Sequence, residues 1–325
     1  MTRGDQITAL LTAAGWADSQ TEPVAGDLSA RRYTRLTRRN GETAILMDAP
    51  PASDATTPAF VQMTGWLAAH GLSAPAILAQ DARNGLLLLE DFGDLKISNL
   101  ITQDAARTSD IYDTVIDLLL HIRDVPPPPL VRPDPKALVH MTTLAQHHYP
   151  GVDTDALQPF SSVLETVLQS LSATSPTLSL RDFHADNLMW LPDRHGIQRL
   201  GLLDYQDAFL THPVYDLVSL LTDARTDIAP DFRADMIARY ATKSGDIPAD
   251  LHRAFAAFSA QRNLRILGIF ARAARQHGKT AHLAKLPRVY GYFTLALSHP
   301  IFSDVREETL AAIPEPTQDL IEAIA

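Results

Sequence analysis

The chain has 325 residues, of which 46% are hydrophobic and 20% are charged, as in ordinary globular proteins. A single hydrophobic core rarely grows beyond this size, so two lobes are expected. Acidic residues outnumber lysine and arginine by 38 to 28, and the resulting net charge of -10 opposes binding to nucleic acid. No cysteine occurs, which excludes disulfides, thiolate metal sites and cysteine nucleophiles.

The amino-terminal segment lacks the pattern of an export signal. Asp5 interrupts it, and the apolar stretch that follows is short and polar. No run in the chain approaches the roughly 18 apolar residues that a membrane span requires. We therefore expect a cytoplasmic protein that does not bind membranes.

The first part of the chain alternates helical and extended patterns. Asn-Gly pairs at residues 40–41 and 84–85 each stand between extended runs, which is typical of tight hairpins. The expected elements, in chain order, are a helix over 5–14, strands over 26–36 and 42–50, a helix over 60–70, and two strands within 76–94.

After Gly93 the pattern becomes mostly helical. Apolar residues recur at helical spacing over 108–123, 160–171 and 231–243, and the tetraproline at 126–129 is expected to be an extended connector. Residues 262–279 alternate cations with apolar residues. A helix on a membrane surface has a similar pattern, but the acidic net charge favours a packed helix with a solvated basic face.

Polar residues that suit phosphoryl transfer gather around a predicted hairpin within residues 178–208. Asn187 precedes its first strand and Asp204 follows its second, so the open end of the hairpin brings an amide oxygen and a carboxylate together. Such oxygen ligands are typical of Mg²⁺ bound to a nucleotide. Asp182 lies five residues before Asn187, where it can deprotonate an attacking hydroxyl.

This spacing is that of a kinase catalytic loop and its metal-binding aspartate. The segment LRDFHADN over 180–187 resembles the His-Gly-Asp-Leu-His-x-x-Asn pattern of the aminoglycoside phosphotransferase-like kinase superfamily, and GLLDYQDAFLTHPVYDLVSLL resembles its second motif. Asp207 and Asp216, in that second motif, are candidates for binding substrate or for bracing the catalytic loop. Asp216 lies near the N-terminus of an apolar helix, which favours bracing for this residue. The resemblance extends over almost the whole chain.

Within the superfamily, the segments GDLSARRYTRL, ILMDAPP, LLEDFGD and RDFHADNLM are most similar to the bacterial anomeric N-acetylmuramate and N-acetylglucosamine kinases of cell-wall recycling. The resemblance implies an α+β, two-lobed protein-kinase-like fold. Residues 1–93 would form a small antiparallel-sheet lobe that binds nucleotide, and residues 94–325 a larger, mainly helical lobe that binds the acceptor. It further implies ATP-dependent transfer to a sugar hydroxyl, with Asp182 as base and with Asn187 and Asp204 on Mg²⁺.

Two residues depart from the superfamily pattern. Leu180 stands where the catalytic loop usually has histidine, and Met47 lies near the third-strand position where kinases place a lysine on the nucleotide phosphates. Another cation must therefore help, or the backbone of the phosphate loop must do more. The candidates are three arginines on or beside the predicted phosphate loop, namely Arg31, Arg32 and Arg35.

Further nucleotide contacts are expected in the same lobe. Ser29 and the amides beside it suit phosphate oxygens. Glu90 and Phe92 lie where a hinge would join the lobes, and the backbone there would bind adenine.

Three other functions remain open from the sequence. The acceptor would be an aminoglycoside, or a small alcohol such as choline or homoserine, without any change in the catalytic residues. The missing lysine and histidine also fit a non-catalytic nucleotide-binding pseudokinase, although such a protein would not need Asp182. The sequence leaves the oligomeric state undetermined.

Overall fold

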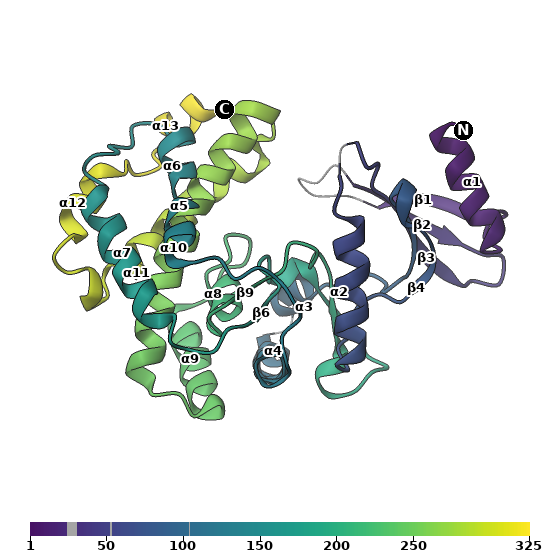
Figure 1. Ribbon diagram of the computed structural model, residues 1–325, viewed down its shortest axis with the longest axis horizontal. Helices are drawn as coiled ribbons and strands as arrows, with labels where there is room; N and C mark the ends of the chain where they lie inside the picture. The colour runs from purple at the N-terminus through teal and green to yellow at the C-terminus, as the bar shows by residue number, and fades with distance from the viewer. Residues whose placement is uncertain (25–30, 53, 104) are drawn as a thin grey trace. The chain divides into compact units, whose positions relative to one another are not determined.

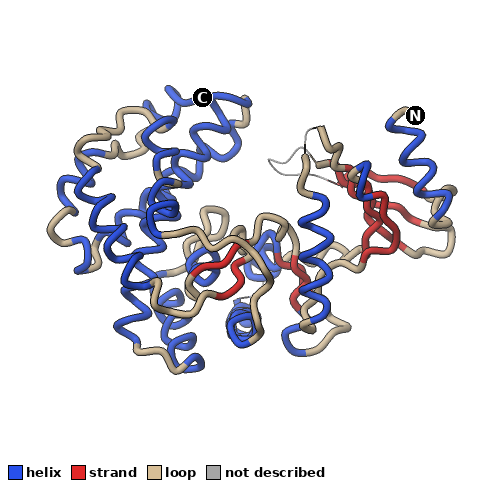
Figure 2. Tube along the Cα trace, in the orientation of Figure 1, coloured by secondary structure: helices blue, strands red, loops and turns tan. Residues whose placement is uncertain are grey.

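The computed structural model describes residues 1–24, 31–52, 54–103 and 105–325. The chain forms two compact units, Met1–Thr114 with Asp186–Ala208, and Val115–Ala185 with Phe209–Ala325. The first unit holds the main β-sheet (Figure 1), whereas the second is mostly helical (Figure 2). Assignment of nucleotide binding to residues 1–93 and of acceptor binding to residues 94–325 stays a prediction.

The first unit contains a five-stranded antiparallel sheet in the order β1-β2-β3-β5-β4. Its strands are β1 (Gln20–Val24), β2 (Arg32–Thr37), β3 (Thr43–Asp48), β4 (Ile77–Asp81) and β5 (Leu86–Glu90). Both predicted hairpins are confirmed, since β2 pairs with β3 and β4 pairs with β5. Gly41 and Gly85, the glycines of the two Asn-Gly pairs, have positive φ angles of 86° and 66°, which residues with a Cβ rarely adopt.

One face of this sheet is covered by the amino-terminal helix α1 (Arg3–Ala13). Side chains in a strand alternate between faces, and the buried residues on this face follow that alternation. The cluster contains Leu10 of α1, Trp16 after it, and Leu36, Ala44, Leu46, Leu86 and Leu88 of the sheet. Burial of apolar side chains between α1 and the sheet therefore stabilises this part of the unit.

The hairpin predicted within residues 178–208 is also confirmed, and it belongs to the first unit. Its strands are β7 (Leu188–Trp190) and β8 (Leu200–Leu202), which pair with Leu188 opposite Leu202. Tyr205 anchors its end on helix α2 (Thr57–Ala69), where its ring stacks 4.9 Å from that of Phe60 and its hydroxyl lies 2.7 Å from that of Thr64. These contacts hold a segment from the middle of the chain against its amino-terminal part.

The second unit is built mainly of helices. Helix α3 (Ile97–Gln103) still belongs to the first unit, and α4 (Ala105–Asp124) passes from the first unit into the second. The second unit also contains one strand pair, β6 (Thr177–Ser179) with β9 (Phe209–Thr211). Its other α-helices are α5 (Pro135–His140), α6 (Thr143–His148), α7 (Gln158–Leu171), α8 (Tyr215–Leu221), α9 (Pro230–Ser244), α10 (Pro248–His277), α11 (Leu286–Leu297), α12 (Arg306–Ala312) and α13 (Gln318–Ile324). The helices predicted over 108–123, 160–171 and 231–243 lie within α4, α7 and α9. Over the described residues, no helix combines the length and apolar character needed to cross a membrane.

Helix α10 approaches α6 very closely at Gly268. A Cβ added at Gly268 would lie 2.2 Å from the carbonyl carbon of Leu144 and 2.3 Å from the amide nitrogen of Ala145. Both neighbours are backbone atoms, so they cannot rotate away as a flexible side chain would. The absence of a side chain at this position is what allows the two helices to pack.

We expect Gly268→Ala to lower the free energy of unfolding by about 1–3 kcal/mol, because the new methyl group forces α10 away from α6. The control is Gly291→Ala in α11, where an added Cβ meets nothing within 4 Å. That change should raise the free energy of unfolding by up to about 1 kcal/mol, since alanine favours helix over glycine. Urea denaturation of both variants gives the comparison, and equal stability of the two would contradict the packing argument.

Candidate active site

The loop that carries Asp182 has a constrained backbone. Arg181, directly before it, has a φ of 69°, which costs energy for a residue with a side chain. The amide of Asp182 donates to the carbonyl oxygen of Leu180 at 2.8 Å. Such a turn must be held by its surroundings.

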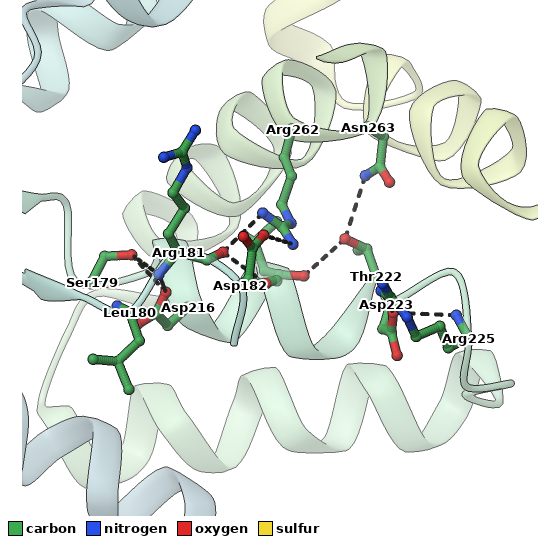
Figure 3. Close-up of polar contacts among 12 residues, drawn as sticks. Ser179, Leu180, Arg181, Asp182, Asp216, Thr222, Asp223, Arg225, Arg262 and Asn263 are labelled. Carbon is green, nitrogen blue, oxygen red and sulfur yellow. Dashed lines mark hydrogen bonds and ion pairs between the residues drawn. The ribbon is translucent and has the colours of Figure 1, made fainter. Parts of the chain in front are cut away.

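Asp216 of α8 supplies much of that support (Figure 3). Its carboxylate accepts hydrogen bonds from the Ser179 hydroxyl at 2.6 Å, the Leu180 amide at 2.7 Å and the Arg181 amide at 3.2 Å. Burial raises the pKa of Asp216 to about 6, while these donors act in the opposite direction. The bracing role predicted for Asp216 is confirmed.

The carbonyl side of Arg181 is held by α8 again and by α10. Its carbonyl oxygen accepts from the Arg262 guanidinium of α10 at 3.0 Å and from the Ser219 hydroxyl of α8 at 3.3 Å. Both backbone groups of the left-handed residue are therefore paired. The position of the loop depends on α8 and α10 as well as on its own sequence.

Asp182 itself is partly accessible and electrostatically favoured as a carboxylate. Its side chain is 44% exposed, and an oxygen lies 3.7 Å from the Arg262 guanidinium. Burial opposes its ionisation, but the positive charges of Arg262, Arg181 and Arg265 outweigh that effect and hold the pKa of Asp182 below its usual range. The group is thus an ionised acceptor at neutral pH.

His184, two residues further, is a buried neighbour of this loop. Burial lowers the pKa of His184 to about 4, and the charge of Arg225 acts in the same direction. The imidazole is consequently neutral at physiological pH. Arg225 pairs with the buried Asp223 at 3.4 Å, so the positive charge of Arg225 is balanced by a neighbouring carboxylate (Figure 3).

Asn187 and Asp204 lie together at the open end of the β7–β8 hairpin. The amide of Leu203 donates to the carbonyl oxygen of Asn187 at 3.0 Å, which places the two positions side by side. Asp204 has a φ of 57° and an accessible side chain, 44% exposed. One of its carboxylate oxygens accepts from the Gln206 amide at 2.9 Å.

The three candidate phosphate-binding arginines have different surroundings. Arg31 is buried, pairs with Asp54 at 2.7 Å and reaches Asp204 at 3.4 Å. Arg32 is 68% exposed and pairs with Asp48, whereas Arg35 pairs with Asp91 and Asp94. Ser29 lies outside the described residues. Of the three, Arg31 is the arginine found beside a predicted metal ligand.

The predicted hinge residues follow the end of β5. The amide of Glu90 donates to the carbonyl oxygen of Ala76 at 2.8 Å, and its side chain pairs with Arg194. The Arg194 guanidinium also lies 5.2 Å from the centre of the Phe92 ring. Within the described part of the chain, the amide of Phe92 makes no hydrogen bond.

Two residues of the Asp182 surroundings were not expected from the sequence. Arg262 and Arg265 were predicted to lie on a solvated basic face, but their exposed fractions are 5% and 8%. The prediction was wrong for these two positions in the middle of α10, because both cations are buried and interact with Asp182. Their three-residue spacing, which puts them on one side of the helix, was the available signal.

Comparison with known proteins gives the same family as the sequence motifs. The Phosphotransferase enzyme family matches residues 20–258. The N-acetylmuramate/N-acetylglucosamine kinase of Caulobacter vibrioides is 33% identical and aligns with 92% of this chain and 93% of its own. The kinase of the same name from Pseudomonas aeruginosa is 28% identical, with 95% and 94% covered. These relatives confirm the resemblance seen in the sequence.

A solved structure supports the fold class. The crystal structure of a choline/ethanolamine kinase family protein from Mesorhizobium loti has a TM-score of 0.63 and 14% identity, covering 94% of this chain and 97% of that one. This likeness confirms the predicted protein-kinase-like fold. Since the family match spans most of the sequence and a relative at 33% identity covers nearly all of it, the chain belongs to the phosphotransferase enzyme family.

Proposed function

We propose that the chain is an ATP-dependent kinase that phosphorylates the anomeric hydroxyl of N-acetylmuramate and N-acetylglucosamine in cell-wall recycling. The observation that carries this proposal is the match, over nearly the whole chain, to relatives named as kinases of these two sugars. The ionised, braced Asp182 supports phosphoryl transfer over nucleotide binding alone, because a binding module needs no base.

Asp182 is the proposed base. Its carboxylate takes the proton of the acceptor hydroxyl as the hydroxyl oxygen bonds to the γ-phosphorus. The bond from that phosphorus to the bridging oxygen breaks, and ADP leaves. The hydrogen bonds of Asp216 fix the backbone before Asp182, so the carboxylate does not have to be ordered at the moment of reaction.

Asn187 and Asp204 are the proposed Mg²⁺ ligands. Both present oxygen atoms at one end of a hairpin, and the exposure of Asp204 leaves its carboxylate accessible. The described residues contain no group of three or more histidine, cysteine or acidic side chains that could hold a metal. Mg²⁺ typically takes one or two protein oxygens and completes its coordination with water and phosphate, which fits this pair. When bound, it neutralises charge on the transferred phosphoryl group.

Arg31 is the cation we propose in place of the third-strand lysine. It is buried beside Asp204, whereas Met47 offers no charge. Arg32 and Ser29 are proposed as further phosphate contacts. Glu90 and Phe92 are proposed to bind adenine through the backbone, with the amide of Phe92 as donor because the amide of Glu90 is already paired.

We expect wild-type enzyme to release ADP from ATP with N-acetylmuramate and N-acetylglucosamine, and to give the 1-phosphate by NMR. Asp182→Asn keeps the shape but not the base, so kcat should fall by about 10²- to 10⁴-fold. Coupled assays on these sugars, an aminoglycoside, choline and homoserine give the comparison, and thermal unfolding checks the fold of the variant.

Turnover confined to the aminoglycoside or to the small alcohols would contradict the proposed acceptor and identify that compound class as the acceptor instead. ATP binding without turnover on any of the five compounds would favour the pseudokinase.

We expect Asp204→Asn to lower kcat by about 10²- to 10³-fold at saturating Mg²⁺, because a charged ligand of the metal is lost. Titration of activity against Mg²⁺ should also require a higher metal concentration. Asp207→Asn is the matched control, an exposed carboxylate three residues further along the same loop. Equal loss in both variants would contradict the assignment of Asp204.

Arg31→Met and Arg32→Met separate the two proposed phosphate contacts. We expect Arg31→Met to raise KM for ATP about tenfold or more, the effect of losing one charge-assisted hydrogen bond. Arg32→Met should raise KM for ATP less, because Arg32 is exposed and pairs with Asp48 away from Asp204. Steady-state kinetics at saturating sugar decides, and the reverse order of effects would assign the role to Arg32.

A further inference from the structure

Arg265 is one of the buried residues of helix α10. Its exposed fraction is 8%, and in the part of the chain that the structure describes its guanidinium has neither a hydrogen bond nor an ion pair. Burial lowers the pKa of Arg265, and so do the charges of Arg181 and Arg262, whereas Tyr215 and Asp182 act in the opposite direction. A guanidinium nevertheless stays protonated in proteins, so an anion that reaches Arg265 would be held strongly.

The charges around Asp182 show the same imbalance. Arg181, Arg262 and Arg265 all act on the Asp182 carboxylate. The second carboxylate nearby, Asp216, is occupied by the Ser179 hydroxyl and two backbone amides. The Asp216 carboxylate is therefore engaged by the loop and does not pair with Arg265. An uncompensated buried charge is costly, and its retention beside a reactive group indicates that a ligand completes the site.

The missing partner is an anion, and it has two sources in this reaction. One is a carboxylate on the acceptor, and the other is a phosphate of the nucleotide. The proposed metal ligands and Arg31 belong to the first unit, whereas Arg265 belongs to the second unit together with Asp182, which would hold the acceptor hydroxyl. The guanidinium fork suits a carboxylate and a phosphate equally, so the placement of Arg265 decides between them. These observations favour the acceptor.

We propose that Arg265 binds a carboxylate on the sugar acceptor and sets the preference between the two sugars. The inference rests on the proposed function. N-acetylmuramate carries a carboxylate on its lactyl group and N-acetylglucosamine has none. Arg265 therefore contributes to binding and orienting the first sugar, while the second reacts without that contact.

The test is the ratio of kcat/KM for N-acetylmuramate to that for N-acetylglucosamine in wild type, Arg265→Met and Arg265→Lys. A charge-assisted hydrogen bond is lost for one acceptor alone, so the ratio should fall by about 10- to 100-fold in Arg265→Met. Arg265→Lys keeps the positive charge, so the ratio should fall less in that variant. Arg275→Met, an exposed arginine of the same helix, is the control and should leave the ratio unchanged.

The methyl ester of N-acetylmuramate provides an independent arm. Wild-type enzyme should use this neutral ester as poorly as Arg265→Met uses the free acid, and the variant should not distinguish ester from acid. Thermal unfolding of each variant, with and without ATP, identifies any loss of fold. Because N-acetylglucosamine is measured on the same preparation, its retained turnover shows that the variant is folded and catalytically competent.

Several outcomes would overturn the inference. An equal loss on both sugars with a raised KM for ATP would assign Arg265 to a nucleotide phosphate, and an equal loss with unchanged KM for ATP would give it a structural role. An unchanged ratio would exclude any contact with the carboxylate. Failure of wild type on both sugars would instead overturn the proposed function, and the inference with it.

Discussion

The carboxylate of Asp216 receives the Ser179 hydroxyl and the amides of Leu180 and Arg181, the three residues that lead into Asp182. These hydrogen bonds set the backbone of the loop, and the left-handed Arg181 is tolerated because its carbonyl oxygen is paired as well. The direction of the Asp182 side chain follows from this backbone. Its geometry is thus imposed by helices that lie far along the chain.

Two carboxylates close to one another are placed in opposite electrostatic conditions. Asp216 is buried among neutral donors, and burial raises its pKa to about 6. Asp182 is surrounded by arginines that hold its pKa low. Environments that separate the ionisation of neighbouring groups are typical of enzyme sites. Here the buried group serves structure, and the accessible group is the one that stays ionised and can receive a hydrogen bond from a hydroxyl.

Local rules predicted much of the fold from the sequence. The Asn-Gly turns, the alternating strands and the apolar spacing of α4, α7 and α9 depend on neighbours in the chain. The hairpin that joins Asn187 to Asp204 was predictable for the same reason. The roles of Arg262 and Arg265 were not, because burial of a helix face is decided by distant packing. Neither was the grouping of residues 186–208 with the amino-terminal sheet, since contacts such as Tyr205 on Phe60 have no local signature.

That grouping means that the chain passes between its two units three times, after Thr114, Ala185 and Ala208. During synthesis, the ribosome releases the sheet long before the hairpin that packs with it. Until Gly201 and Tyr205 have been synthesised, the ring of Phe60 lacks its stacking contact with Tyr205, and Phe92 lacks its close contact with Gly201. A nascent chain shorter than about 208 residues therefore exposes apolar surface that the finished protein covers. Chaperone dependence should accordingly be greatest during translation of this middle region.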